Sequence, residues 1–334
     1  MEQWLTRLWY RESAGPSLLQ PLSWLYGVIT SIRRQAYTHG VLKSRRAGKP
    51  VIVVGNLTVG GTGKTPLVAW LAGQLSVSGL KVGIVSRGYG RSSREPAVVH
   101  VESDWRDVGD EPVLLRQLTG CDTVVAQDRV AGARKLVELG ADVVIADDGL
   151  QHLRLARDCE IVVVDGARGF GNGRLLPAGP LREPASRLQD ADIVVINGIP
   201  AADISDAIPA PRLADVGAAG ALRMVLFGAE AHRVDGLAGP MPLDHLRGRR
   251  AHAVAGIGNP QRFFQDLRAR GIEIVEHPYP DHHPFVAADL TFDDGLPVLM
   301  TQKDAVKCRS FAHSRLWYVP VTARFDDTQA RELL

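Results

Sequence analysis

The amino-acid sequence predicts an α/β protein built on a parallel sheet, with a second, smaller α/β domain and an N-terminal amphipathic helix. Three observations support this fold class. Short β-branched runs alternate with helical patterns from residue 50 onward, a glycine-rich loop follows the first of these runs, and residues 1–49 differ in composition from the rest. Buried β-branched runs that alternate with helices are typical of a parallel sheet covered on both faces.

Length and composition are those of a globular protein. The 334 residues are 45% hydrophobic and 23% charged, enough for a sizeable core in one or two domains. The net charge of +2 gives no overall field that would attract nucleic acid, so we expect no nucleic-acid partner. The three cysteines are far apart and form no C-x-x-C pair, which indicates a reducing, cytosolic environment. Charged residues precede any apolar run, so no secretory signal is predicted.

Residues 1–49 are predicted to form a membrane-associating helical segment. No charged residue occurs between positions 13 and 32, and large apolar residues recur there at steps of four and three, at Leu18, Leu22, Leu25, Ile29 and Ile32. Proline and polar residues dilute the run too much for a transmembrane helix. Aromatic residues flank it and basic residues follow it, which favours a helix at an anionic membrane surface. The alternative is a stripe that packs against the protein's own core.

Residues 50–221 and 222–334 are predicted as two α/β domains. In the first, strands are predicted at residues 51–54, 81–85, 123–126, 142–146, 160–165 and 192–197, with helices at 66–75 and 129–139. Residues 198–221, rich in Ala, Pro and Asp, are interpreted as a connection. In the second domain, strands are predicted at 251–255, 273–277, 297–300 and 316–319, with helices at 260–270 and 304–311.

The glycine-rich loop between the first strand and the first helix is the strongest functional signal. Glycines let backbone N–H groups surround phosphate oxygens, and the helix N-terminus adds its positive end. Lys64 is placed to reach the β- and γ-phosphates, and the Thr65 hydroxyl to bind Mg²⁺, which makes the sheet one of P-loop NTPase type. Thr58 stands where the motif usually has its first glycine. The predicted nucleotide-binding residues are Thr58, Val59, Gly60, Gly61, Thr62, Gly63, Lys64 and Thr65.

A P-loop needs an acidic partner for Mg²⁺ at the end of another strand. The apolar run at residues 142–146 ends in Asp147, Asp148 and a glycine, and Asp147 is the predicted metal-side acid. Gln151 and His152 follow closely, where polar groups would sense the γ-phosphate. The alternative is a strand-to-turn cap, for which Asp and Gly are common residues.

A second acidic pair, Asp110 and Glu111, lies between a glycine and a proline. Phosphoryl transfer to a hydroxyl needs a carboxylate or imidazole that orients the acceptor and takes its proton. From spacing alone, however, a helix N-cap is the favoured interpretation, because Asp followed by Glu and Pro opens a helix well.

Several basic and histidine positions permit anion binding or proton transfer. Arg87 and Arg91 lie on a glycine hinge after a strand, and Arg174 and Arg182 lie on a long glycine-containing loop. The hinge suits anion binding or merely a turn with solvated arginines. The loop would clamp a phosphorylated substrate or would merely be a mobile connection. Adjacent His282 and the next histidine diverge on extended backbone, so zinc chelation is not predicted, and an Asp–His proton acceptor and a polar turn are equally supported.

Taken together, these motifs resemble the tetraacyldisaccharide 4′-kinase family, the lipid A 4′-kinases of Gram-negative bacteria. The P-loop, the arginine hinge, the Asp110 segment, the Asp147 segment, the run Gly173 to Pro184, Asp281-His282 and the run Thr301 to Lys307 match in order along nearly the whole chain. The resemblance implies ATP- and Mg²⁺-dependent phosphorylation of the 4′-hydroxyl of tetraacyldisaccharide 1-phosphate, a membrane-embedded lipid sugar, to give lipid IV-A. It further implies a location at the cytoplasmic face of the bacterial inner membrane, where the N-terminal helix rests. We expect a monomer.

The resemblance also assigns roles, and it reverses the preference for a cap at Asp110. Asp110 becomes the expected base, helped by His282 across the interdomain cleft, while Lys64 serves ATP and Thr65 and Asp147 serve Mg²⁺. The remaining residues expected to line the site or contact substrate are Glu111, Asp148, Gln151, His152, Arg87, Arg91, Arg174 and Arg182.

Two other functions remain open from the sequence. A membrane-associated regulatory ATPase or GTPase also joins a glycine loop to an amphipathic helix, but such proteins usually carry an extra lysine where this chain has Val59. A non-catalytic nucleotide-binding scaffold would share the P-loop without needing Asp110.

Overall fold

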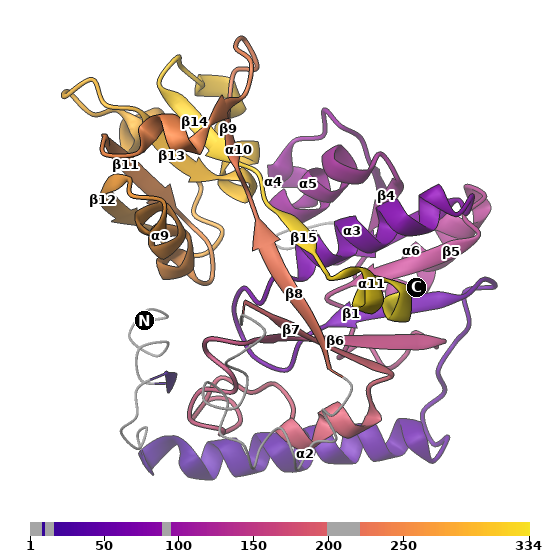
Figure 1. The fold of residues 1–334 in the computed structure, drawn as a ribbon. Helices are drawn as coiled ribbons and strands as arrows, with labels where there is room; N and C mark the ends of the chain where they lie inside the picture. The colour runs from indigo at the N-terminus through magenta and orange to yellow at the C-terminus, as the bar shows by residue number, and fades with distance from the viewer. Residues whose placement is uncertain (1–8, 11–16, 89–94, 199–220) are drawn as a thin grey trace.

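The computed structural model describes residues 9–10, 17–88, 95–198 and 221–334. Figure 1 shows two β-sheets, each covered by helices and connected by two segments of the chain, with a long helix beneath the larger sheet. The mixed α/β fold with a parallel sheet is confirmed.

The larger sheet has nine strands in the order β15-β8-β7-β6-β1-β5-β2-β4-β3. From β8 to β4 all neighbours run parallel, and only the outer strands β15 and β3 are antiparallel. The carboxyl ends of the parallel strands therefore share one edge of the sheet. The strands are β1 (Val51–Gly55), β2 (Val82–Ser86), β3 (Ala97–Val99), β4 (Asp122–Val125), β5 (Val143–Asp147), β6 (Cys159–Asp165), β7 (Ile193–Asn197), β8 (Leu222–Phe227) and β15 (Thr322–Arg324).

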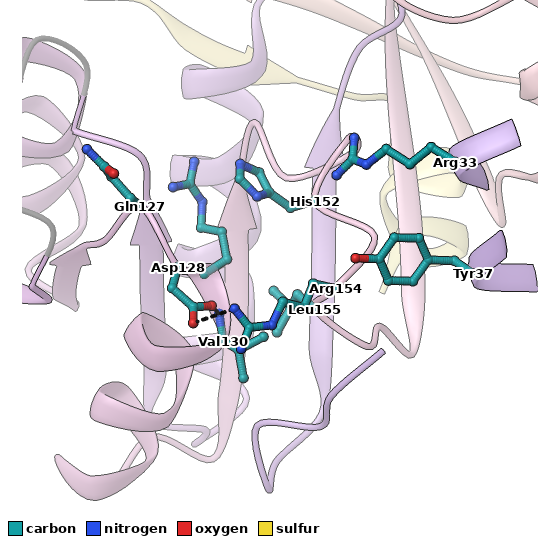
Figure 2. A pocket seen from close by; sticks show the side chains of 9 residues that line it. Arg33, Tyr37, Gln127, Asp128, Val130, His152, Arg154 and Leu155 are labelled. Carbon is teal, nitrogen blue, oxygen red and sulfur yellow. Dashed lines mark hydrogen bonds and ion pairs between the residues drawn. The ribbon is translucent and has the colours of Figure 1, made fainter. Parts of the chain in front are cut away.

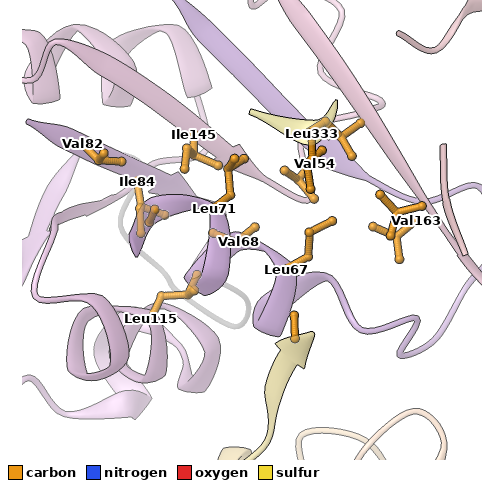
Figure 3. Close-up of a cluster of buried hydrophobic side chains, with 14 of the residues drawn as sticks. Val54, Leu67, Val68, Leu71, Val82, Ile84, Leu115, Ile145, Val163 and Leu333 are labelled. Carbon is orange, nitrogen blue, oxygen red and sulfur yellow. The ribbon is translucent and has the colours of Figure 1, made fainter. Parts of the chain in front are cut away.

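Helices cover both faces of this sheet, as its apolar strands require. On one face α3 packs with the C-terminal helix against β1 and its neighbours, through Leu67, Leu71 and Leu333 (Figure 3). On the other face α6 covers Val53 and Val85. The helices of this part are α3 (Lys64–Val77), α4 (Trp105–Val108), α5 (Asp110–Thr119), α6 (Arg129–Glu138), η2 (Ala185–Asp190) and α11 (Asp327–Leu333).

The smaller sheet has six strands in the order β10-β9-β14-β13-β11-β12, with the four strands from β14 to β12 parallel. Its two faces are covered by α9 and α10. The elements are β9 (Glu230–Arg233), β10 (Met241–Pro242), η4 (Leu243–Leu246), β11 (Arg250–Ala255), α9 (Pro260–Ala269), β12 (Glu273–Pro278), η5 (Ala287–Leu290), β13 (Val298–Thr301), α10 (Gln302–Cys308), η6 (Arg309–Phe311) and β14 (Leu316–Val319).

The chain crosses between the sheets twice, so the predicted division at residue 221 does not coincide with the division between them. β8 extends the larger sheet beside β7, and β15 returns to pair with β8 before α11 packs beneath α3. Three-residue β15 has only one buried side chain, too few for an apolar pattern to reveal it. Most of the predicted connection at 198–221 lies outside the described residues.

The amphipathic helix α2 (Gln20–Thr38), preceded by η1 (Ser17–Leu19), exposes its apolar side. All five residues of the predicted stripe are exposed, whereas Ser23 is buried, donating a hydrogen bond from Oγ to Leu175 O at 2.8 Å. Tyr26 donates from its hydroxyl to Arg182 O at 3.0 Å. The helix thus docks through its polar side, and the interpretation that the stripe packs against the core is wrong. Among the described residues, no helix has both the length and the apolarity to cross a membrane.

The basic residues that follow the stripe are partly engaged within the protein. Their exposed ion pairs are Arg34 with Asp190, Arg46 with Asp158, and Lys49 with Asp142. Exposed pairs of this kind exchange readily with other anions, because each contributes little stability.

Candidate active site

The P-loop follows β1 and ends where α3 begins at Lys64. Gly63 precedes the helix with φ of 93°, and a Cβ there would lie 2.1 Å from Asn197 Nδ2, so the position requires glycine. Thr58 needs none, because it is held in extended pairing with Leu181, and among the described residues only Asp148 and His282 have positive φ without being glycine. The departure of Thr58 from the usual motif therefore leaves the loop intact.

Lys64 lies in a network of polar side chains from three loops. Its Nζ donates to Asn56 Oδ1 at 2.9 Å and lies 3.4 Å from Asp148 Oδ1. Arg182 holds the same carboxylate at 3.1 Å and also donates to Gln151 Oε1 at 3.4 Å. Burial alone would raise the pKa of Asp148, but the charges of Lys64 and Arg182 outweigh it and hold that pKa well below its usual range. The structure thus brings together Lys64, Asp148, Gln151 and Arg182.

Asp147 ends β5 almost fully buried, with 1% of its surface exposed. Ser86 donates to its Oδ2 at 3.1 Å, but Oδ1 has no hydrogen-bond partner. Burial, together with the nearby carboxylates of Glu111 and Asp148, raises the pKa of Asp147. A buried, unsatisfied carboxylate oxygen fits a hard cation such as Mg²⁺, which prefers oxygen ligands. Within the described ranges, no three His, Cys, Asp or Glu side chains cluster to hold a metal.

Asp110 and His282 come from different sheets and meet. The N-cap of α5 is Gly109, and Asp110 is the first residue of the helix, so the interpretation of Asp110 as the N-cap is wrong. Its Oδ1 accepts from Glu111 N at 2.8 Å. His282 Nδ1 lies 3.0 Å from both carboxylate oxygens of Asp110. Burial tends to raise the pKa of Asp110, but the hydrogen bond from His282 and the nearby lysine charges lower it to about 2. Burial lowers the pKa of His282 and the bond to Asp110 raises it, with a net increase.

The P-loop itself is covered by the smaller domain. A Cβ on Gly258, in the loop after β11, would come within 2.4 Å of Gly61 N, so the two backbones are in close contact. Arg168 joins them by donating to Gly61 O at 2.7 Å and to Gly258 O at 3.1 Å. The nucleotide-binding loop and the Asp110–His282 pair therefore lie along the same interdomain seam.

A basic pocket of about 170 Å³ lies where the loop after β4 meets the loop after β5 and helix α2 (Figure 2). It is lined by Arg33, Tyr37, Gln127, Asp128, Arg129, Val130, His152, Arg154 and Leu155. The Arg129 guanidinium is buried, and its Nε and one terminal nitrogen have no hydrogen-bond partner. Burial and the charges of Arg129, Arg87 and Arg33 lower the pKa of His152 to about 4.

Sequence reasoning missed the arginines of this pocket. A usable signal existed, because Asp128 and Arg129 follow a parallel strand at the same sheet edge as the P-loop and Asp147, where ligands of such sheets bind. Arg154 is paired with Asp128 at 3.0 Å across the pocket wall (Figure 2).

The remaining predicted site residues are distributed as follows. Glu111 pairs with Lys303 at 2.9 Å, beside the Asp110–His282 pair. Arg87 is exposed after β2 and lies close enough to influence Arg129 and His152. Arg174 instead lines an apolar groove of about 730 Å³ between α2 and the loop that precedes η2. Arg91 lies outside the described residues.

Comparison with known proteins identifies the family of this chain. Residues 16–334 match the family described as tetraacyldisaccharide-1-P 4′-kinase (LpxK). Tetraacyldisaccharide 4′-kinases from Methylobacillus flagellatus and Alkalilimnicola ehrlichii are 46% and 50% identical, with 99% and 92% of this chain and 95% and 88% of theirs aligned.

The crystal structure of the "apo" form of LpxK from Aquifex aeolicus in complex with ATP is 31% identical in sequence, with a TM-score of 0.75 over 95% of this chain and 97% of that one. The chain therefore belongs to the tetraacyldisaccharide 4′-kinase family, the ATP-dependent phosphotransferases of lipid A biosynthesis.

Proposed function

We propose that the interdomain seam transfers the γ-phosphoryl group of ATP to the 4′-hydroxyl of a tetraacylated glucosamine disaccharide 1-phosphate in the membrane. The observation that carries this proposal is the 3.0 Å contact between Asp110 and His282, delivered by separate sheets beside a P-loop. Phosphoryl transfer depends mainly on positioning and charge, and an acceptor hydroxyl additionally needs a group that takes its proton.

The Asp110–His282 pair supplies that group. Asp110 stays ionised at neutral pH, accepts from His282 Nδ1, and so fixes the ring, and its hydrogen bond raises the pKa of His282 above the ordinary histidine value. Because the two groups are hydrogen-bonded, they titrate as a unit, and the unprotonated pair is the active form. The proton leaves the 4′-oxygen for this pair as that oxygen bonds to the γ-phosphorus. The bond between the γ-phosphorus and the β,γ-bridging oxygen breaks, and ADP leaves.

The nucleotide is held by residues 58–65 and by Lys64, which exchanges its present contacts with Asn56 and Asp148 for phosphate oxygens. Thr65 and Asp147 would hold Mg²⁺, which neutralises charge developing on the phosphates. The unsatisfied Oδ1 of Asp147 supports that role. A cation there also favours the ionised form of this buried carboxylate.

The basic pocket fits the 1-phosphate of the acceptor. Arg129 offers two buried donor nitrogens without a hydrogen-bond partner, and Arg33 and His152 line the same space. Charge-assisted hydrogen bonds from a buried guanidinium are strong and geometrically selective. The pocket would then bind the 1-phosphate at one end of the disaccharide, while the 4′-hydroxyl at the other end faces the Asp110–His282 pair.

The exposed stripe of α2 fits the membrane surface, and the groove beside it fits an acyl chain. An acceptor with four acyl chains cannot leave the bilayer cheaply, at about 0.8 kcal/mol per buried CH₂, so the enzyme has to approach the membrane. We infer peripheral attachment at the cytoplasmic face of the bacterial inner membrane, as a monomer.

A direct test follows labelled γ-phosphate from ATP into disaccharide 1-phosphate lipid in mixed micelles. Asp110→Asn should lower kcat by about 10²- to 10⁴-fold, the range for loss of a general base, while ATP still binds. Retention of parental turnover by this variant would remove the proposed role of the pair. ATP consumption without a lipid acceptor would argue for a regulatory ATPase instead.

A further inference from the structure

Helix α10 fixes a fully buried lysine beside the Asp110–His282 pair. Thr301 caps the helix, and Asp304 accepts from Gly256 N at 2.9 Å and from the Thr301 hydroxyl at 2.6 Å. Asp304 in turn lies 2.8 Å from Lys307 Nζ, and neither side chain is exposed. Lys307 therefore cannot swing to another position without breaking this network.

The Lys307 ammonium points at the larger domain. It lies 3.9 Å from Asp110 Oδ2 and 5.0 Å from the centroid of the Phe285 ring. The ammonium contacts Asp304 as an ion pair without hydrogen-bonding geometry. A buried ammonium is costly unless its charge is compensated, so the carboxylates of Asp304 and Asp110 share one cation.

Lys303 lies one turn earlier on the same face of α10 and contacts the neighbours of both members of the pair. Its Nζ donates to Glu111 Oε1 at 2.9 Å and to Asp281 Oδ1 at 3.2 Å. Glu111 follows Asp110 in α5, and Asp281 precedes His282. One ammonium thus fastens the helix that carries Asp110 to the loop that carries His282.

The charged groups that face Asp110 come from two elements. His282 arrives from the loop after β12, and Lys303 and Lys307 arrive from α10. The other carboxylates of the cluster are each neutralised by a lysine: Glu111 and Asp281 by Lys303, and Asp304 by Lys307. Both lysines lower the pKa of Asp110, and Lys303 also opposes protonation of His282.

Resting on the function proposed above, we propose that Lys303 and Lys307 are positioning residues: they hold the Asp110 carboxylate ionised and aligned with His282 only while α10 is docked on α5. Neither lysine touches the reacting atoms. They act through the pair, so the base is complete only when the smaller domain is in place.

The test compares Lys303→Met and Lys307→Met with Lys303→Arg and Lys307→Arg in the full chain, using Lys135→Met on the exposed side of α6 as control. Both Met variants should lose about 10- to 100-fold in kcat, as misplaced catalytic groups do, with the KM for ATP unchanged. The acid limb of their rate profile should move to higher pH by about one unit, because a cation that favours the ionised pair is gone. The Arg variants should keep the parental acid limb, and Lys135→Met should behave as the parent.

A purely structural role would lower kcat and thermal stability without moving the acid limb, which would overturn the proposal. If Lys307→Met fails to fold because Asp304 is left unpaired, Lys303→Met and the double variant Asp304→Asn/Lys307→Met decide the question by the same profile. Asp110→Asn separates the two claims. If Asp110→Asn loses turnover but the lysine variants keep the parental kcat and pH profile, only the positioning roles of the lysines are refuted. If Asp110→Asn keeps full turnover, the proposed function is refuted as well.

Discussion

The proposed membrane binding through α2 gives a prediction whose size follows from the exposure of the apolar stripe. Leu22, Leu25 and Ile29 are 54%, 57% and 56% exposed, so roughly half of each side chain has still to be buried. Full burial of such a side chain contributes about 1.5–3 kcal/mol of transfer free energy. Burial of the exposed half in the membrane therefore contributes about 1 kcal/mol. Replacing all three by Gln removes about 3 kcal/mol of transfer free energy, or about 100-fold in partitioning, and Gln preserves helix propensity.

The measurement is co-sedimentation with vesicles of phosphatidylethanolamine and phosphatidylglycerol, together with KM for lipid acceptor in the same vesicles. The triple variant should sediment about 100-fold less well and show a raised KM for the acceptor, with an unchanged KM for ATP. The double variant Val77→Gln/Leu237→Gln, at exposed apolar positions away from α2, controls for general loss of apolar surface. Equal sedimentation of the triple variant and the parent would refute the role of the stripe.

Three further predictions concern the site. Arg129→Met should raise the KM for an acceptor that bears the 1-phosphate about 10- to 100-fold and leave the KM for an acceptor without this phosphate unchanged. A variant that still prefers the phosphorylated acceptor would contradict the assignment of the pocket. Asp147→Asn should raise the Mg²⁺ concentration for half-maximal activity by about tenfold or more. In EDTA the same variant should keep or increase the melting temperature, because burial disfavours the charge of the native carboxylate. A lower melting temperature would contradict this reasoning. The value of kcat/KM should fall as the pH drops through a midpoint above 6.5, because His282 must be unprotonated and its pKa is raised. A midpoint below 6.5 would exclude His282 as the proton acceptor.

The parallel sheet and the P-loop could be predicted because both are encoded locally. Each central strand is a short β-branched run, and the sequence from β1 to α3 contains the whole phosphate loop. The outer strands β3 and β15 could not, since they have three residues each and depend on pairing with a neighbour far along the chain. β8 is longer, but its assignment to the larger sheet is decided by tertiary pairing with β7 rather than by its own pattern.

The candidate site also contains residues whose position the local sequence predicts and residues whose position it does not. Lys64 and Asp147 follow apolar strands, so their position at the sheet edge is implied by the pattern. The contact of Asp110 with His282 spans 172 residues and two domains, and no local spacing encodes it. Arg129 was overlooked because a single arginine after a strand has no motif, although the topology of a parallel sheet places it at the same edge.

Two hydrogen bonds of the Asp110 carboxylate explain why the local sequence suggested a helix cap and why the family resemblance suggested a base. The carboxylate accepts the backbone N–H of Glu111 in the first turn of α5 and also the imidazole of His282. The first bond fixes the carboxylate in the larger domain, and the second is available only when the smaller domain is docked. Gly258 and Arg168 contact the P-loop along the same seam. Under the function proposed above, docking of the smaller domain therefore covers the nucleotide and also completes the Asp110–His282 proton acceptor. Such coupling would disfavour phosphoryl transfer to water, because the proposed base is assembled only when the smaller domain is docked.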